Sequence, residues 1–230
     1  MAHPLPPLSL IETRVLGVLV EKQQTVPDTY PLTLNALVSG CNQKTSRHPV
    51  MEASDAEVQA AIDTLKGYSL VIESSGGRVA RHEHNVGRVL QLPAQSTALL
   101  AVLMLRGPQT AGELRIGCDR LHRFADISSV EAFLAELAAR PAGPLVIELP
   151  RLPGARENRW GHLLSGAPAI EAVIETRADV APDEVGSLRD QVARLQADVD
   201  FLKALLARVC SRLDISATLP AESPEQPKMP

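Results

Sequence analysis

The tetrapeptide LVIE stands at residues 70–73 and again at residues 145–148, 75 residues further along the chain. Before the first copy, the stretch 54–66 places Val58 and Leu65 among apolar residues spaced three and four apart, which is the period of an amphipathic helix. After each copy comes a turn and a second extended run, which indicates a β-hairpin. The repeat therefore predicts that one helix-and-hairpin unit occurs twice.

Both units also begin alike. Helical stretches at 9–22 and 96–106 are each followed by a proline, Pro27 or Pro108, and then by a short second helix. Three helices followed by a hairpin are the order of a winged helix-turn-helix domain. We predict a mainly α protein with small β-hairpins, an α+β fold made of two tandem winged helix-turn-helix domains. A pair of unrelated modules is the alternative.

The helix starts carry a sequence signature of their own. Ser9, Ser54 and Ser128 are each followed three residues later by a glutamate, the capping-box pattern. We expect these serines to be the N-caps of the first helix and of the two third helices.

The most specific stretch is PDTYPLTLNALVSGCNQKTSRHPVM, residues 27–51. With it, the sequence from residue 8 onward resembles the bacterial YceH family, and the similarity extends through the second unit to about residue 165. The resemblance implies two winged-helix domains, and it implies no particular activity.

The C-terminal part predicts a coiled coil, because apolar residues alternate in steps of three and four over four heptads. Valine at the first three a positions and leucine at the first three d positions favour a parallel homodimer. The alternative is a helix that folds back on its own domain. The predicted dimer seam consists of Val185, Leu188, Val192, Leu195, Val199, Leu202, Leu206 and Val209.

Six segments follow from these patterns. We predict a disordered N-terminus (1–7), winged-helix domain 1 (8–90), winged-helix domain 2 (91–166), a linker (167–184), a coiled-coil helix (185–213) and a disordered tail (214–230).

Composition limits the class of protein. No apolar run reaches the roughly 18 residues that a membrane span needs, and the N-terminus lacks the pattern of a signal peptide. The three cysteines, Cys41, Cys118 and Cys210, are widely spaced and odd in number, which favours reduced thiols. We expect a cytoplasmic protein that does not associate with a membrane.

The sequence predicts neither an enzyme nor a cofactor or metal site. Cysteines and histidines are present, but none forms a CxxC pair or a second pair at zinc-finger spacing. The glycine and serine motifs of nucleotide-binding proteins and hydrolases are also missing from the sequence. The alternative is a cysteine nucleophile at Cys41, beside Lys44 and His48.

Nucleic acid and protein remain competing ligands. In a helix-turn-helix fold the third helix enters the major groove, but the stretches 54–66 and 128–140 are acidic and would be repelled by phosphates. Duplex DNA would then be contacted weakly, by the basic hairpins and the 42–48 loop. The alternative is a protein-interaction or scaffold module that uses the acidic third helices. The predicted phosphate contacts are Lys44, Arg47, Arg78, Arg81, His82, Arg151, Arg156 and Arg159.

The segment 41–52 between the second and third helices of the first unit is longer than a turn requires. Its run of eight polar or reactive side chains suggests a binding loop. The alternative is that Asn42, Gln43, Thr45 and Ser46 hydrogen-bond the backbone of the loop itself.

Overall fold

A computed structural model describes residues 5–74, 79–151, 154–167 and Val199. The chain divides into two compact units, Met1–Arg177 and Ala178–Pro230. All the elements below belong to the first unit. Of the second unit the structure describes Val199, which is helical and 46% exposed.

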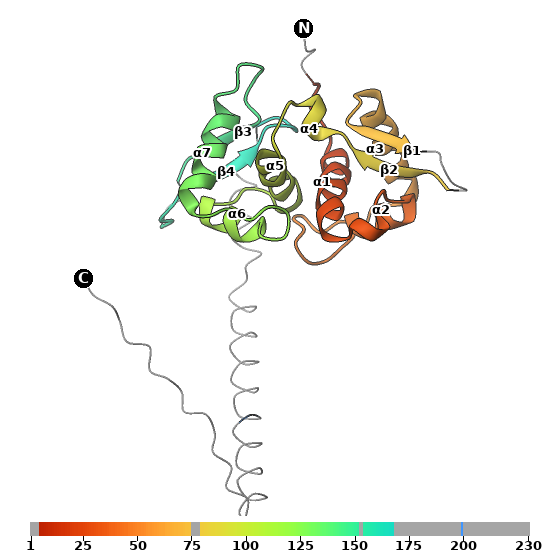
Figure 1. The fold of residues 1–230 in the computed structure, drawn as a ribbon, viewed down its shortest axis with the longest axis horizontal. Coiled ribbons are helices and arrows are strands. Elements are labelled where there is room, and N and C mark those ends of the chain that lie inside the picture. Colours follow the sequence, from red (N-terminus) through yellow and green to blue (C-terminus); the bar gives the residue numbers. More distant parts are fainter. Residues whose placement is uncertain (1–4, 75–78, 152–153, 168–198, 200–230) are drawn as a thin grey trace, which may run out of the picture. The chain divides into compact units, whose positions relative to one another are not determined.

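The first unit has two halves with the same order of elements (Figure 1). The first half contains α1 (Leu10–Thr25), the 3-10 helix η1 (Pro27–Thr29), α2 (Leu34–Cys41), α3 (Asp55–Gly67), β1 (Val71–Ser74), β2 (Arg81–His84) and α4 (Val86–Val89). The second half contains α5 (Ala94–Arg106), α6 (Ala111–Gly117), α7 (Ile127–Ala138), β3 (Val146–Leu149) and β4 (Arg159–His162). In the described ranges this is an α+β fold, as predicted, and its order is consistent with tandem winged helices.

Side-chain caps explain where most helices start. In α1 the Ser9 hydroxyl accepts a hydrogen bond from the Glu12 N–H at 3.3 Å, and the Ser9 N–H donates to the Glu12 carboxylate at 2.7 Å. Ser54 and Glu57 form the same reciprocal box at α3. Such a box satisfies amide groups that a helix start leaves without partners. Two of the three predicted boxes, those at Ser9 and Ser54, are confirmed.

The cap of α7 differs from the prediction. The N-cap is Asp126, whose carboxylate accepts from the Ser129 N–H at 2.7 Å. Ser128 therefore lies within the first turn of the helix. The prediction was wrong because Asp126, two residues earlier, has the extended backbone of an N-cap and places an acceptor on the third helical amide.

The two LVIE copies occupy matching places in the hairpins. Strand β1 pairs antiparallel with β2, and β3 with β4, so that Glu73 lies opposite His82 and Glu148 opposite Trp160. The opening leucine and valine of each copy are buried, whereas Ile72 and Ile147 are each 38% exposed. The literal repeat therefore reflects a shared core position.

A third segment joins each hairpin. Leu32 forms a β-bridge with His82 and Gln109 forms one with Trp160. The second strand of each hairpin therefore lies between the first strand and this bridging residue. The outer edges of β1 and β3 face away from the bridges.

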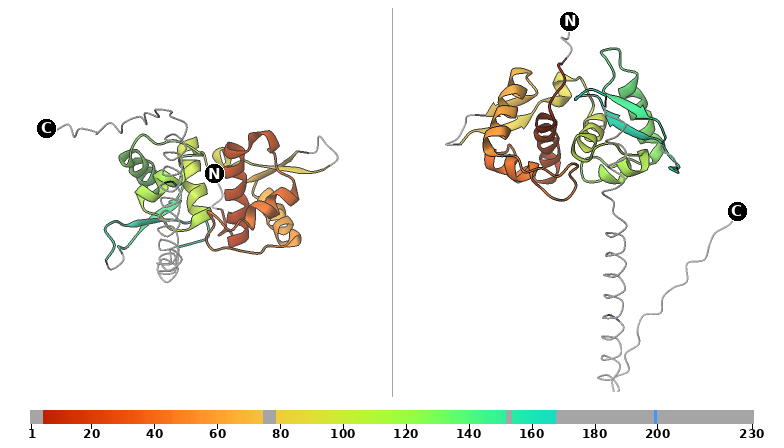
Figure 2. Two further views of the ribbon diagram at one scale, coloured as in Figure 1. Left: turned by 90° about the horizontal axis from the view of Figure 1, so that it is seen from below. Right: turned by 180° about the vertical axis from the view of Figure 1, so that it is seen from behind.

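Helices α1 and α5 pack against each other at the centre of the unit, with the remaining elements of each half on opposite sides (Figures 1 and 2). A Cβ at Gly17 of α1 would lie only 2.9 Å from Leu105 Cγ, so the glycine permits this close approach. The two halves share one hydrophobic core. The Leu8 N–H also donates to the Leu164 carbonyl at 2.7 Å, which ties the start of the first half to the end of the second.

Among the described helices, none has the length and apolar character required to cross a membrane.

Candidate functional site

Arg47, predicted to contact phosphate, is a buried structural residue. It is 6% exposed, and its guanidinium forms an ion pair with Glu21 of α1 at 2.7 Å. Further hydrogen bonds from the guanidinium reach the carbonyls of Gly40 and Ser46 and the side chain of Gln43. With its N–H groups directed at these acceptors, the side chain is not available to a phosphate.

The 41–52 segment forms hydrogen bonds within the first half and also to α5 of the second half. Asn42 exchanges two hydrogen bonds with the backbone of Ala53, which closes the loop on itself. The His48 N–H donates to the Leu105 carbonyl at 2.8 Å, and Arg106 donates to the Ser46 hydroxyl at 3.0 Å. The loop therefore contacts α5 of the other half.

A second buried arginine also hydrogen-bonds to the backbone of the same loop. Arg14 of α1 donates to the carbonyls of Cys41 at 3.0 Å and Pro49 at 2.7 Å. These two carbonyls mark the ends of the loop's polar run. In the described part of the loop, Lys44 is the exposed cation.

The first hairpin keeps its cationic residues close to the protein. Arg81 is exposed, but its guanidinium donates to the carbonyls of Thr29 and Pro31 at 3.2 and 2.7 Å. His82 is only 2% exposed, and burial, opposed by the charge of Glu73, lowers its pKa. A neutral, buried imidazole is a poor phosphate contact. Arg78 lies outside the described residues.

The second hairpin has both engaged and exposed arginines. Arg159 donates to the Pro108 carbonyl at 2.7 Å and forms an ion pair with Glu113 at 3.1 Å. Arg151 and Arg156 are exposed. Together with Lys44, they are the described members of the predicted set whose charge faces solvent without a hydrogen bond to the protein.

The two described cysteines are buried at the ends of the short second helices. Burial raises the pKa of Cys41 to about 11 and that of Cys118 to about 12. A thiol of this kind is protonated at neutral pH, which makes it a poor nucleophile and a poor metal ligand. In the described ranges, no three histidine, cysteine or carboxylate side chains gather as a metal site would require.

The outward faces of the third helices are acidic. On α3 the carboxylates of Asp55, Glu57 and Asp63 are exposed, and on α7 those of Glu131 and Glu136 are exposed. The other side of each helix packs into the core, with Val58 and Leu65 of α3 and Leu134 of α7 among the fully buried residues there. The acidic side chains of the stretches 54–66 and 128–140 therefore face solvent.

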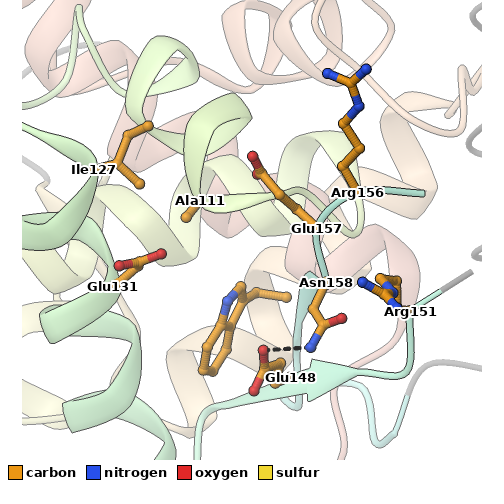
Figure 3. Close-up of a pocket in the computed structure, with 9 residues that line it drawn as sticks. Ala111, Ile127, Glu131, Glu148, Arg151, Arg156, Glu157 and Asn158 are labelled. Carbon is orange, nitrogen blue, oxygen red and sulfur yellow. Dashed lines mark hydrogen bonds between the residues drawn. The ribbon is translucent and has the colours of Figure 1, made fainter.

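The second half contains a cleft of about 400 Å³ next to α7. Its lining combines the starts of α6 and α7 with both strands of the hairpin and the turn between them. Figure 3 shows Glu131 on the α7 side, Glu148 on the strand, and Arg151 and Arg156 beyond Asn158. The lining residues are Ala111, Ile127, Glu131, Glu148, Arg151, Arg156, Glu157, Asn158 and Trp160.

The polar groups of this cleft are partly fixed. The Asn158 side chain donates to the Glu148 carboxylate at 2.8 Å, which holds that carboxylate beside the ring of Trp160 on the facing strand. The guanidinium of Arg156 points away from both Glu131 and Glu148 (Figure 3). Glu131, Glu148 and the indole thus form one side of the cleft, and Arg151 and Arg156 form the other, together with a third carboxylate, that of Glu157.

The sequence pattern predicts a hairpin that begins with the second LVIE copy and ends in Glu148, but it does not predict that Glu148, Glu131 and Trp160 lie together. The available signal for the pairing of Glu148 with Trp160 was the hairpin itself, because the last residue of the second LVIE copy must lie opposite a residue of the returning strand. The position of Glu131 relative to that strand depends on how α7 packs on the hairpin. No sequence pattern carries that information.

The predicted coiled-coil seam lies outside the described residues, apart from Val199. Its role in dimerisation therefore stays a prediction.

Comparison with known proteins places the chain in a family. A family model described as "protein of unknown function, DUF480" matches residues 8–155. A UPF0502 protein of Dechloromonas aromatica is 63% identical over 207 residues, which cover 90% of this chain and 97% of the relative. A UPF0502 protein of Burkholderia multivorans is 57% identical over 220 residues, covering 94% and 93% of the two chains, and one of Cupriavidus taiwanensis is 58% identical over 219 residues, covering 93% and 90%. In agreement with the resemblance found in the sequence, the chain belongs to the DUF480/UPF0502 family of bacterial proteins.

Proposed function

We propose that the chain is a non-enzymatic, cytoplasmic protein-interaction module that presents the outward faces of α3 and α7 to a protein partner. One observation carries the proposal. The carboxylates of the third helices face solvent, whereas Arg47, Arg81 and Arg159 are hydrogen-bonded to the protein itself. A surface of this kind repels phosphates and attracts basic protein segments.

Two further features support a non-enzymatic, cytoplasmic role. Cys41 and Cys118 are free thiols, as expected for a reducing compartment. Their raised pKa values disfavour a cysteine nucleophile.

Site-specific photo-cross-linking in the living bacterium tests this proposal. A photo-reactive amino acid replaces Ala60 on α3 or Ala135 on α7, both of which are exposed. We expect a discrete protein adduct from at least one of these positions. The same substitution at Arg88 of α4, also exposed, is the matched control and should give no such adduct.

The adduct must depend on the acidic surface. For the α7 position, changing Glu131 and Glu136 to lysine should abolish the adduct, because the charge that attracts the partner is inverted. Adducts that survive this change, or an absence of protein adducts at both helices, would overturn the proposal.

Duplex DNA is the second candidate, favoured by the exposed cations Lys44, Arg151 and Arg156. Contacts of this kind are mainly to backbone phosphates, so binding should be weak and should fall steeply with salt. Fluorescence anisotropy with random duplex DNA, at low and moderate salt, measures it. Changing the three residues to alanine should remove the binding, and an absence of binding at low salt would eliminate this candidate.

A further inference from the structure

The two halves differ at one equivalent position beside the third helix. In the first half, Glu73 ends the LVIE copy and forms an ion pair with Lys66 at the end of α3. In the second half, Glu148 ends the LVIE copy, and the structure gives it a hydrogen bond from Asn158, a neutral side chain. The carboxylate is therefore charge-neutralised in one half and lacks a cationic partner among the described residues in the other.

The sequence of α7 explains why Glu148 has no counterpart of Lys66. Aligning the buried residues Val58 with Val130 and Leu65 with Leu137 places Ala138 where the first half has Lys66. Arg140, which follows α7, donates to the Leu90 carbonyl at 2.6 Å. The chain thus offers Glu148 no cation from this helix end.

The residue opposite the carboxylate also differs. Glu73 lies across the strands from His82, which is buried, whereas Glu148 lies across from Trp160, which lines the open cleft. An indole face attracts cations, and the attraction adds to that of a carboxylate next to it. Glu131 contributes a second carboxylate to the same side of the cleft (Figure 3).

We propose that the cleft formed by Trp160, Glu131 and Glu148 binds the cationic side chain, lysine or arginine, of a protein partner. The incoming cation takes the place that Lys66 fills in the first half. The cleft's volume of about 400 Å³ accommodates one long side chain together with part of the peptide that carries it. Arg151 and Arg156, on the opposite side, limit entry to a partner whose flanking groups are neutral or acidic.

This inference rests on the proposed function and specifies how the α7 surface would recognise its partner. It assigns a role to Trp160, Glu131 and Glu148, which neither the enzyme hypothesis nor the DNA hypothesis uses. It also predicts an asymmetry, because the first half has the position filled by its own lysine.

The single tryptophan of the chain makes the test direct. The full-length protein is labelled with ¹⁵N, and its one indole N–H signal reports on the cleft. The probe is an acetylated and amidated pentapeptide whose central arginine carries its only charge. We expect a saturable shift of the indole signal, and no saturable shift with the same peptide carrying citrulline, which has nearly the same shape and no charge.

Matched variants locate the effect. Changing Glu131 and Glu148 together to glutamine keeps the shape of the cleft and should weaken binding of the arginine peptide at least tenfold. Changing Asp119 to asparagine removes an exposed carboxylate of the second half that lies neither on α7 nor in the lining of the cleft, and it should alter the affinity less than twofold. An unchanged thermal midpoint in each variant confirms that the fold is retained.

Two outcomes would overturn the inference. One is an equal response to the arginine and citrulline peptides, and the other is an equal loss of affinity in the Asp119 variant. If either occurs while cross-linking at Ala135 still yields a protein adduct, the protein-interaction function stands and the cation-binding cleft does not. If cross-linking fails but the charge-dependent peptide response is present, the cleft binds cations and the proposed use of the helix faces is wrong.

Discussion

At the scale of single residues, buried arginines determine what the 41–52 segment does. Arg14 and Arg47 together hydrogen-bond the carbonyls of Gly40, Cys41 and Pro49. Burying a guanidinium is costly unless its donors and its charge are satisfied, and here the carbonyls and Glu21 satisfy most of both. The loop is therefore held as part of the core.

Loss of the buried cation should cost stability. In an Arg47→Met variant, Glu21 keeps a partly buried charge without its bidentate partner, so we expect the free energy of unfolding to fall by about 3 kcal/mol. Urea denaturation measures this change. Lys44→Met, in the same loop but exposed, should change it by less than about 0.5 kcal/mol. Equal losses in both variants would show that the loop is not braced by Arg47.

Two partly buried histidines should make stability depend on pH. Burial lowers the pKa of His84 and of His162 to about 4, and the Nδ1 atom of each is buried without a hydrogen-bond partner among the described residues. Between pH 6.5 and 4 the unfolded chain binds protons that the folded chain does not. The free energy of unfolding should therefore fall as pH decreases through this window, by at most about 1.4 kcal/mol per pH unit for each histidine.

Substitution with a side chain that does not titrate isolates this contribution. His162→Gln, and separately His84→Gln, should each flatten the pH dependence between pH 6.5 and 4 in urea denaturation series. A slope as steep as that of the unchanged protein would contradict the assignment.

At the scale of elements, the contact between α1 and α5 joins the two halves. Its closeness depends on Gly17, because a Cβ there would meet Leu105 Cγ at 2.9 Å and Met104 Cβ at 3.4 Å. Residues 98–105 of α5 are all buried, which shows that this helix lies inside the shared core. Each half has its own hairpin, but the two halves pack together through α1 and α5.

Filling this contact should destabilise the fold. Gly17→Ala forces α1 and α5 apart, and we expect a net loss of about 1–2 kcal/mol in the free energy of unfolding even though alanine favours the helix. Gly67→Ala is the matched control, because a Cβ at Gly67 meets nothing within 4 Å. That variant should be neutral or slightly more stable in thermal denaturation. A stabilised Gly17→Ala protein would mean that the helices can separate without cost.

At the scale of the whole molecule, the predicted dimer would carry two kinds of recognition surface, the third-helix faces and the cleft. The third-helix faces are both acidic, and the second half has an open cleft beside its hairpin. A parallel pair of C-terminal helices would bring two such clefts into one assembly. A partner with two cationic side chains, bound by both clefts at once, would then be held far more tightly than by one cleft.

The predicted dimer can be tested on the full-length chain. Changing Leu195 and Leu202 to lysine places charges in the seam, and sedimentation equilibrium should then show a monomer. Ala197→Lys adds a charge at an outer position of the same heptads and should leave the dimer intact. A mass that is the same for all three proteins would contradict the coiled coil.

The sequence by itself determined the order of three helices and a β-hairpin in each half, but it did not predict η1 or α4. Its apolar spacing, the capping boxes at Ser9 and Ser54 and the repeated LVIE are local signals, acting over a few residues. Where two local signals competed, as at Ser128 and Asp126, the sequence pattern alone chose the wrong cap.

Only the tertiary structure decided which polar residues are exposed. Arg47 finds its partner Glu21 26 residues earlier in the chain, on a different helix, and Glu131 meets the Trp160 cleft through the packing of α7 on its hairpin. The charge of an arginine and its position in the sequence are the same whether its side chain faces water or a buried carboxylate. Its environment depends on contacts between distant segments, and those contacts exist only once the helices have packed.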